Sequence, residues 1–416
     1  MKIMQDNYVI SKCSLVPYEG GSLKEEYNIV LGNPVIDYFE SIKSPSISMT
    51  VTFIDVDQVI SRKGITGGEY IDVEVIFESA GAPKPFKIMS KKHKLILNAV
   101  RNVVTTPNKQ VATLEFVSVE SIINETARVS KKYTKNVSNT VMELLVGDEK
   151  GIQTSKNLDK HESTNSYSFI GNLKRPFDTI QWLCPKSQSS TKNFGFLFYE
   201  NSDGYHFKSI EKLLEQDPVA TYSASEIPST NFSFKIIENN LNRSNDIGMN
   251  CRMGMYANKT IFVDIENNTQ QVVDFDISEL KLKKPPKLPT GLEKQPTRRM
   301  FRILDQGALQ KGSTKEDVEK RNELAIYQNR SYARNNLLFS QSLNISVPIN
   351  IDLKVGDIIN IEFPLKSDED PSKASKMGSD KTNDLSGKYL ISELRHMIGN
   401  GKSSTQLQLI RDVFTA

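Results

Sequence analysis

The feature of this chain that most constrains its fold is a strand pattern that occurs twice, once near each end. The first copy spans 68–75, 87–90 and 112–116, and the second spans 356–363, 389–392 and 405–409. Each copy opens with a glycine and an acidic residue and then alternates apolar with polar residues, as half-buried β-strands do. The pattern predicts one duplicated β-domain. A chance likeness is the alternative, because a period of two leaves few distinguishable patterns.

Such a duplication has a consequence for assembly. A chain with two equivalent domains contributes two blades to a ring, so three copies imitate a sixfold surface. The 416 residues exceed one ordinary core, and domains of about 100 to 150 residues predict three or four modules. We expect a mainly β (α+β) fold, with two similar antiparallel β-barrel domains and two smaller mixed α/β accessory domains.

Composition excludes several classes of protein. Apolar residues make up 38% and charged residues 25%, which predicts a soluble globular chain. No run approaches the roughly 20 apolar residues of a membrane span, and residues 1–23 lack the apolar stretch of a signal peptide. We therefore expect a cytosolic product without stable membrane insertion.

Charge and cysteine usage narrow the chemistry further. Lys and Arg number 53 against 50 acidic residues, and this balance argues against a dedicated nucleic-acid binder while leaving room for a passive channel. Cys13, Cys184 and Cys251 lie far apart without a CxxC spacing, which indicates neither a zinc site nor a disulfide framework. We expect buried or partly buried thiols.

The first domain is expected over residues 1–119. Alternation over 47–53 and 71–77 predicts two half-buried antiparallel strands. The connector 63–69 carries the glycines of a tight turn and lacks the Lys-Ser/Thr end of a phosphate-binding loop. A strand over 111–119 closes this domain.

A mixed α/β accessory domain is expected over 120–191. Ser138 is a candidate helix cap, and the polar stretch 154–166 indicates an exposed loop. In the string 175–184, Pro176 suits the first helical position and the apolar residues fall on one stripe. This predicts a short docked helix that carries the only Trp.

The remaining chain is divided between a second β-barrel domain, over 192–245 and 331–416, and an inserted accessory domain over 246–330. A hairpin of aromatic strands is expected over 194–207, followed by a helix that Ser209 starts. Further predicted elements are strands within 246–280 and a helix over 315–338.

Two polar stretches have no predicted regular structure. The basic, Pro-rich tract 281–289 is interpreted as an extended connector, with an arm that binds nucleic acid or a partner as the alternative. The loop 366–383, rich in Ser, Lys and Asp, is expected on the surface, and its contacts cannot be assigned from sequence.

No catalytic, cofactor-binding or metal-binding residue can be assigned. The four histidines, His93, His161, His206 and His396, have no metal-site spacing, and GxSxG, HExxH and Walker motifs are absent. The acid pairs Asp55 with Asp57 and Asp274 with Asp276 are two apart on predicted strands and so share a face. Such pairs can serve a cation site or glycoside hydrolysis, although acids on a strand face are far more often solvated.

Several strings, taken in order, resemble the baseplate central hub protein of contractile-tailed bacteriophages (the myovirus tail hub family). They are 38–42 with 44–47, 65–69, 175–183, 205–210 and 355–359. The resemblance implies a homotrimer in which two β-barrel tube domains per subunit form a pseudo-sixfold ring, with two further domains outside and below it.

The same resemblance implies partners and a location in the virion tail baseplate, after assembly in the host cytoplasm. The ring would join the hexameric tail tube, a tube-initiator protein and the tape-measure protein on one side to a trimeric cell-puncturing spike on the other, with DNA only as passing cargo. The alternatives are a cell-wall hydrolase at the tail tip, and another tail-tube or tube-initiator component, which would form sixfold rings.

Overall fold

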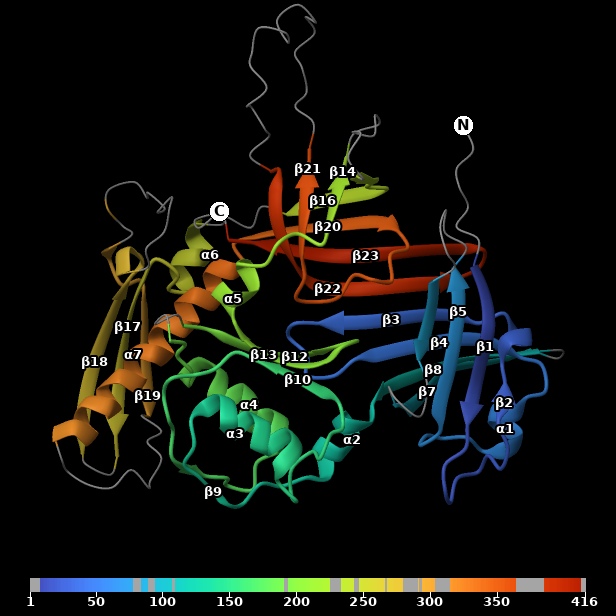
Figure 1. Cartoon of the computed structure of the whole chain (residues 1–416), viewed down its shortest axis with the longest axis horizontal. Helices are drawn as coiled ribbons and strands as arrows, with labels where there is room; N and C mark the ends of the chain where they lie inside the picture. The colour runs from blue at the N-terminus through green and yellow to red at the C-terminus, as the bar shows by residue number, and fades with distance from the viewer. Residues whose placement is uncertain are drawn as a thin grey trace, which may run out of the picture.

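A computed structural model describes most of the chain (Figure 1). The described residues are 8–77, 84–88, 94–106, 109–190, 194–224, 233–242, 247–265, 268–279, 291, 294–303, 315–363 and 385–412. Strands dominate, and helices are concentrated in two smaller regions beside the sheets. The expected mainly β class with mixed α/β accessory parts is confirmed.

The N-terminal strands form a first antiparallel unit. The neighbour order is β3-β4-β8-β7-β5-β1-β2, with β6 on the edge of β5. As predicted, alternate residues of β4 and β5 point into the core, among them Met49, Val51 and Val73. Gly64 ends α1 at positive φ within the predicted turn. The bounds are β1 (Tyr8–Val16), β2 (Tyr27–Asn28), η1 (Val30–Gly32), β3 (Val35–Ser41), β4 (Ser48–Asp55), α1 (Val59–Lys63), β5 (Tyr70–Phe77), β6 (Lys84–Ile88), β7 (Leu95–Thr106) and β8 (Lys109–Ser118).

The C-terminal strands form a second unit together with strands from the middle of the chain. Its order is β14-β21-β22-β23-β20-β16, with β15 parallel to β14. Its buried residues belong to the same hydrophobic core as those of the first unit. The bounds are β14 (Ala220–Ser223), β15 (Ser233–Lys235), β16 (Glu238–Asn242), β20 (Gln341–Pro348), β21 (Ile358–Glu362), β22 (Gly387–Gly399) and β23 (Lys402–Arg411).

The two units repeat the same strand order. The series β3-β4-β8-β7-β5-β1 corresponds to β16-β20-β23-β22-β21-β14. The last strands differ in direction, because β1 is antiparallel to β5 whereas β14 is parallel to β21. In each unit a long hairpin, β7–β8 or β22–β23, carries a bulge in its first strand, between Leu97 and Ala99 or between Ile391 and Glu393. Strand β7 has a second register shift, between Arg101 and Val104, to which no shift in β22 corresponds. The duplication expected from the sequence is therefore present in the fold.

One detail of the predicted duplication is wrong. The string 389–392 lies near the start of β22, whose counterpart is β7. Of its expected partner 87–90, the described residues 87 and 88 belong to β6, which pairs with β5 and with no other strand of the described chain. The mistake has a simple origin, because neighbouring strands of one sheet share the same period of two.

The two units are joined into one sheet. The outer edge of β22 pairs first with β21, over Gly387–Leu390, and beyond the bulge with β3, over Glu393–Ile398. Figure 1 shows β3 running directly beside β22. We call this β3–β22 contact the internal seam.

A first accessory region lies beneath the sheet. It packs short helices and five short strands around an aromatic core that includes Tyr133, Phe177 and Phe207. The hairpin β12–β13 pairs with β10 in a separate three-stranded sheet. The bounds are α2 (Val119–Thr126), β9 (Lys132–Tyr133), α3 (Val137–Met142), η2 (Glu143–Gly147), β10 (Asn157–Lys160), β11 (Phe169–Ile170), α4 (Pro176–Leu183), η3 (Cys184–Lys186), β12 (Phe196–Asn201), β13 (Gly204–Ser209) and α5 (Ile210–Leu214).

Two predictions for this region are confirmed and two are wrong. Helix α4 begins at Pro176, and the Ser209 hydroxyl accepts the Lys212 amide at the start of α5. The cap of α3 is Asn136 rather than Ser138. The stretch 154–166 is not simply an exposed loop, because it contains β10, and parallel pairing with β13 buries part of it.

A second accessory region stands at the far end of the molecule. The long helix α7, predicted over 315–338, lies against a three-stranded sheet of order β18-β17-β19 (Figure 1). The bounds are α6 (Ile247–Arg252), β17 (Ala257–Asp264), β18 (Thr269–Asp276), η4 (Ile277–Glu279), β19 (Arg298–Ile303) and α7 (Lys315–Leu338).

Candidate lining surface and the buried junction behind it

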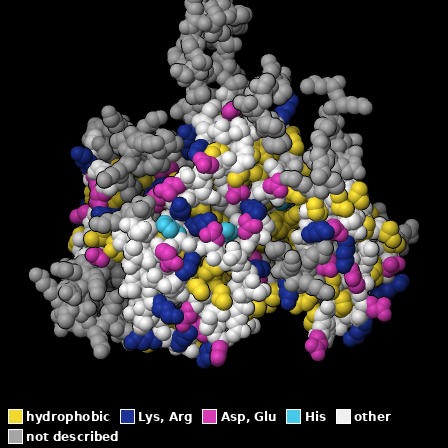
Figure 2. Space-filling view, viewed as in Figure 1, with side chains coloured by type: hydrophobic (Ala, Val, Ile, Leu, Met, Phe, Trp, Pro, Cys, Tyr) yellow, Lys and Arg dark blue, Asp and Glu magenta, His cyan; other side chains and the backbone are white. Residues whose placement is uncertain are grey.

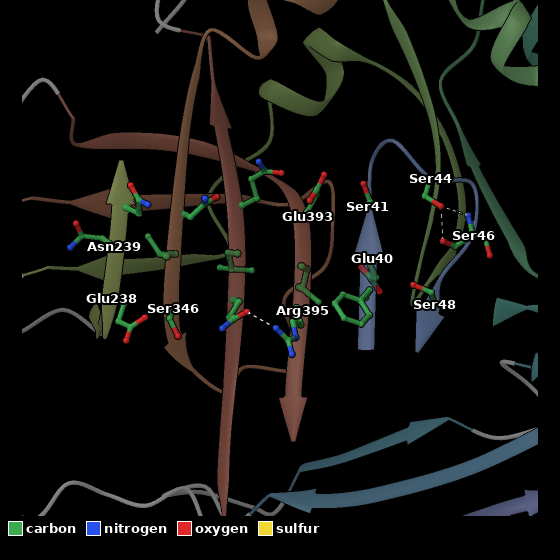
Figure 3. A pocket seen from close by; sticks show the side chains of 18 residues that line it. Glu40, Ser41, Ser44, Ser46, Ser48, Glu238, Asn239, Ser346, Glu393 and Arg395 are labelled. Carbon is green, nitrogen blue, oxygen red and sulfur yellow. Dashed lines mark hydrogen bonds between the residues drawn. The ribbon is translucent and has the colours of Figure 1, made fainter. Parts of the chain in front are cut away.

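One face of the joined sheet carries mainly polar side chains around a hollow. Strand alternation sends one residue in two into the core and its neighbour onto this face, as in β22, where Leu394 and His396 are buried while Glu393 and Arg395 are half-exposed. The face includes a hollow of about 540 Å³ across the internal seam. Figure 3 shows its side chains projecting from β16, β20, β22, β3 and β4. We call it the lining face.

The strand register aligns the lining face into rows that cross from one unit to the other. Directly paired residues of neighbouring antiparallel strands lie on the same side of a sheet. One row is Asn240, Asn344, Gln408, Glu393 and Ser41. A second is Glu238, Ser346, Gln406, Arg395, Phe39 and Ser48. A third is Met397, Asp37, Thr50, Glu115 and Ala99.

Charges on the lining face are mostly paired. Arg395 of β22 contacts Asp37 of β3 at 3.0 Å across the internal seam, and its guanidinium lies over the Phe39 ring. Arg101 contacts Glu115 at 3.0 Å in the first unit. The other polar residues of the face are mainly Ser, Thr, Asn and Gln, and its acids outnumber its two arginines; the acids are Asp37, Glu115, Glu238 and Glu393. Such a surface offers few cations to a phosphate backbone, so it would bind nucleic acid weakly.

A buried carboxylate junction lies behind the lining face. Glu40 sits in the inward phase of β3, and its carboxylate accepts the Tyr38 hydroxyl at 2.8 Å and the backbone amides of Ser202 at 2.8 Å and Val355 at 3.0 Å. These groups come from both sheet units and the β12–β13 turn. Burial raises the pKa of Glu40 to about 7, although the three donors favour the ionised form.

A second buried acid, Glu200 of β12, joins the accessory region to the first unit. It accepts the Ile47 amide at 3.0 Å and the Ser118 hydroxyl at 2.7 Å. Lys156 contacts both Glu200 at 2.5 Å and Glu120 at 2.6 Å, with only 8% of its side chain exposed. Burial opposes the charge on Lys156, but the two carboxylates outweigh it and raise its pKa.

Neither buried acid was found by sequence reasoning, although a signal exists. Glu40 continues the inward phase of Ile36 and Tyr38, and Glu200 continues that of Phe196 and Phe198. An acid in the apolar phase of a strand must be satisfied by partners when it is buried.

The histidines stay apart within the described residues. His396 is buried in the seam, where Nδ1 lies 3.0 Å from the Thr405 hydroxyl, and His206 Nε2 lies 2.8 Å from the side-chain oxygen of Asn201. Burial lowers the pKa of His396 to about 3 and that of His206 to about 4. His161 is at the end of β10, and His93 falls outside the described residues. No cluster of three or more His, Cys, Asp or Glu residues suited to a metal ion occurs in the described part of the chain.

The acid pairs singled out by spacing have different surroundings. Asp55 is buried, and its carboxylate accepts the Val59 and Ile60 amides at 3.0 and 2.9 Å, whereas Asp57 is exposed and lies beyond the strand. The expectation that both lie on one strand face is therefore wrong. Asp274 pairs with Lys259 at 3.2 Å, and Asp276 accepts the Ser278 amide at 2.8 Å.

Other predictions are decided by burial or by coverage. Cys13 and Cys184 are buried and Cys251 is half-buried, all as free thiols, which confirms the expectation. The tract 281–289 and the loop 366–383 lie outside the described residues. Within the described chain no helix has both the length and the apolar character needed to span a membrane.

Comparison with solved structures relates the fold to a tail protein. No protein-family model matches the chain, and neither does any curated protein sequence. Among solved structures, the tail protein from Neisseria meningitidis MC58 matches with a TM-score of 0.56 at 12% identity, covering 98% of both chains. The 43 kDa tail protein of prophage MuSo2 from Shewanella oneidensis gives a TM-score of 0.49 at 9% identity, covering 97% of this chain and 99% of its own.

The comparison with the Neisseria protein extends over nearly the whole length of both chains. The chain therefore has the fold of that tail protein, over both sheet units and both accessory regions.

Proposed function

We propose that this chain is a structural virion protein, the central hub of a phage tail baseplate, and that it works as a symmetry adaptor. Three copies form a ring of six similar sheet units, which accepts a hexameric tail tube on one side and a trimeric cell-puncturing spike on the other. The observation that carries the proposal is the repeated strand order joined by the internal seam. A sheet that repeats its own edge can continue around a ring.

The proposed division follows the sequence boundaries. Tube domains occupy residues 1–119 and 192–245 with 331–416, and accessory domains occupy 120–191 and 246–330. The tube-initiator and tape-measure proteins complete the partners on the tube side, in a tail assembled in the host cytoplasm. The role is structural rather than enzymatic.

The lining face supports a channel for the ejected genome. Its polar, mildly acidic side chains leave few free cations, so DNA passes as cargo without being held. Obligate ring interfaces usually bury about 2,000 Å² or more, so we expect no stable free subunit.

Two measurements test this function. Light scattering after gel filtration should give three times the 46.9 kDa chain mass, and electron microscopy should show rings with six similar densities. Rings of six chains would instead identify a tube or tube-initiator component. A single catalytic subunit that clears bacterial cell wall in zymography, and loses this activity with Asp55→Asn or Asp274→Asn, would favour the hydrolase.

A further inference from the structure

We propose that the joint between subunits is a copy of the internal seam. In this joint the free edge of β16 pairs antiparallel with the free edge of β7, beyond its bulge, from a second copy of this chain. The inference rests on the proposed ring and goes further by naming the two strands and their register.

The first argument is the correspondence between β7 and β22. Before its bulge, β7 pairs with β5 through Ile96 and Tyr70, as β22 pairs with β21. Beyond the bulge, the outer edge of β22 is covered by β3, whereas the same edge of β7, from Ala99 onward, faces no strand in the described chain. One copy of the edge is therefore filled and the other is open.

The second argument is the correspondence between β16 and β3. The second strands of the two long hairpins, β8 and β23, pair with β4 and β20. Strand β3 pairs with the other edge of β4, and β16 pairs with the other edge of β20. The other edge of β3 covers β22, whereas the other edge of β16 has no strand in the described part of the molecule. The sheet thus ends in two edges that match the two sides of its own seam.

The side chains exposed on β7 are those expected of a strand edge that another subunit covers. Residues Arg101 to Thr105 are all exposed, and the side chains of Val103 and Val104 are 43% and 58% exposed. Long strand edges with apolar side chains invite pairing, and natural proteins usually protect them. Because the two edges differ, the contact is head-to-tail, which is the kind of contact that closes rings.

The internal seam also fixes the register. Met397 pairs with Asp37 in the seam. Val111 of β8 precedes Glu115 by as many residues as Ser404 of β23 precedes Gln408, so Val104, which pairs with Val111, holds the place of Met397, which pairs with Ser404. This count follows β8 because β7 has a second register shift between Arg101 and Val104. Asn240 holds the place of Asp37, because each lies two strands from the equivalent positions Gln408 and Glu115. The predicted pair is therefore Val104 of one subunit with Asn240 of the next.

Cysteine cross-linking tests this pair. In a Cys251→Ser background, the double variant Val104→Cys with Asn240→Cys should be oxidised to covalent dimers and trimers on non-reducing gels. Either single variant should give no ladder, because a head-to-tail joint needs both positions. Asp37→Cys with Met397→Cys is the matched control, and it should form a bond within one chain without a gain in mass.

An out-of-register pair sharpens the test. Val104→Cys with Asn239→Cys should cross-link far less, because neighbouring residues of a strand point to opposite faces. A trimer by light scattering that fails to cross-link through Val104 and Asn240 would overturn the seam and leave the ring intact. A monomer whose Asp37→Cys with Met397→Cys control still closes would overturn the ring and the seam together.

Discussion

The buried carboxylate of Glu40 accepts the backbone amide of Val355 at 3.0 Å, across 315 positions of sequence. Glu40 lies on β3 of the first sheet unit, and Val355 precedes β21 of the second. This contact fixes the two halves of the duplication behind the strand pairing of the internal seam. It also places an ionisable group where both halves depend on its protonation state.

Glu40 should make stability depend on pH. Its pKa of about 7 in the folded protein exceeds the usual value of 4.5. Its stabilising contribution is therefore complete below about pH 4.5 and is lost as the pH rises through 7, an effect on the order of 3 kcal/mol. Glu40→Gln cannot ionise, so urea unfolding at pH 5 and pH 8 should show a larger deficit for this variant at pH 5. A deficit that is equal at both pH values would contradict the prediction.

His396 should act in the opposite direction. Burial lowers its folded pKa to about 3, so its contribution is present above pH 6.5 and is lost as the pH falls toward 3. In that window one such histidine costs about 1.4 kcal/mol per pH unit. His396→Gln should flatten the acid side of the stability profile, measured by urea unfolding between pH 6 and pH 4. An unchanged slope would mean that His396 is already charged in the folded state.

Removing the buried lysine should be costly. Lys156→Met leaves Glu200 and Glu120 buried without their cation, which should lower the free energy of unfolding by about 3–5 kcal/mol. Lys43→Met is the control, because Lys43 and Glu393 form a pair 3.4 Å apart with both side chains about half exposed. That change should cost less than about 1 kcal/mol. Equal losses in chemical denaturation would argue against a tight buried network.

Gly356 should not tolerate a side chain. Its φ is +93°, and a Cβ there would overlap the Tyr199 hydroxyl. Gly356→Ala should therefore combine backbone strain of about 1–2 kcal/mol with an overpacking cost of about 1–3 kcal/mol. Gly401→Ala is a matched control, because Gly401 has φ of +71° but open space around it. The two melting temperatures should differ clearly, and similar values would show that Tyr199 moves aside freely.

Charge on the lining face should control affinity for DNA. Glu238→Lys with Glu393→Lys adds two cations to the face, so the assembled protein should gain DNA binding that weakens steeply with salt. The control Asp274→Lys with Glu215→Lys makes the same change in net charge at exposed positions on other parts of the molecule. Filter binding that rises equally for both double variants would indicate a general charge effect and not a lining.

Much of the fold was predictable because apolar and polar residues alternate along its strands. The equivalence of β5 with β21 and of β8 with β23 was identified from sequence, as were the helix α4 and the hairpin β12–β13. The counterpart of β22 was misassigned, since periodicity carries no information on which strands are neighbours.

The candidate site was largely hidden for a related reason. Lys156 lies in a polar stretch that suggests a loop, and it is buried only because Glu120 and Glu200 meet it from 36 and 44 positions away. The lining face likewise emerges only when two distant units are brought into register. The local sequence shows which residues of a strand share a face, but it does not show which residues of other strands lie beside them in the sheet.

The division of the β22 edge between β21 and β3 has a mechanical consequence. One strand belongs to both halves of the chain, so no flexible connector separates them at this point. Swivelling one half against the other would tear the backbone ladder over Glu393–Ile398. In the proposed ring, a load applied to one half of the chain would therefore reach the other half through this ladder, and the two halves would move as a single rigid element.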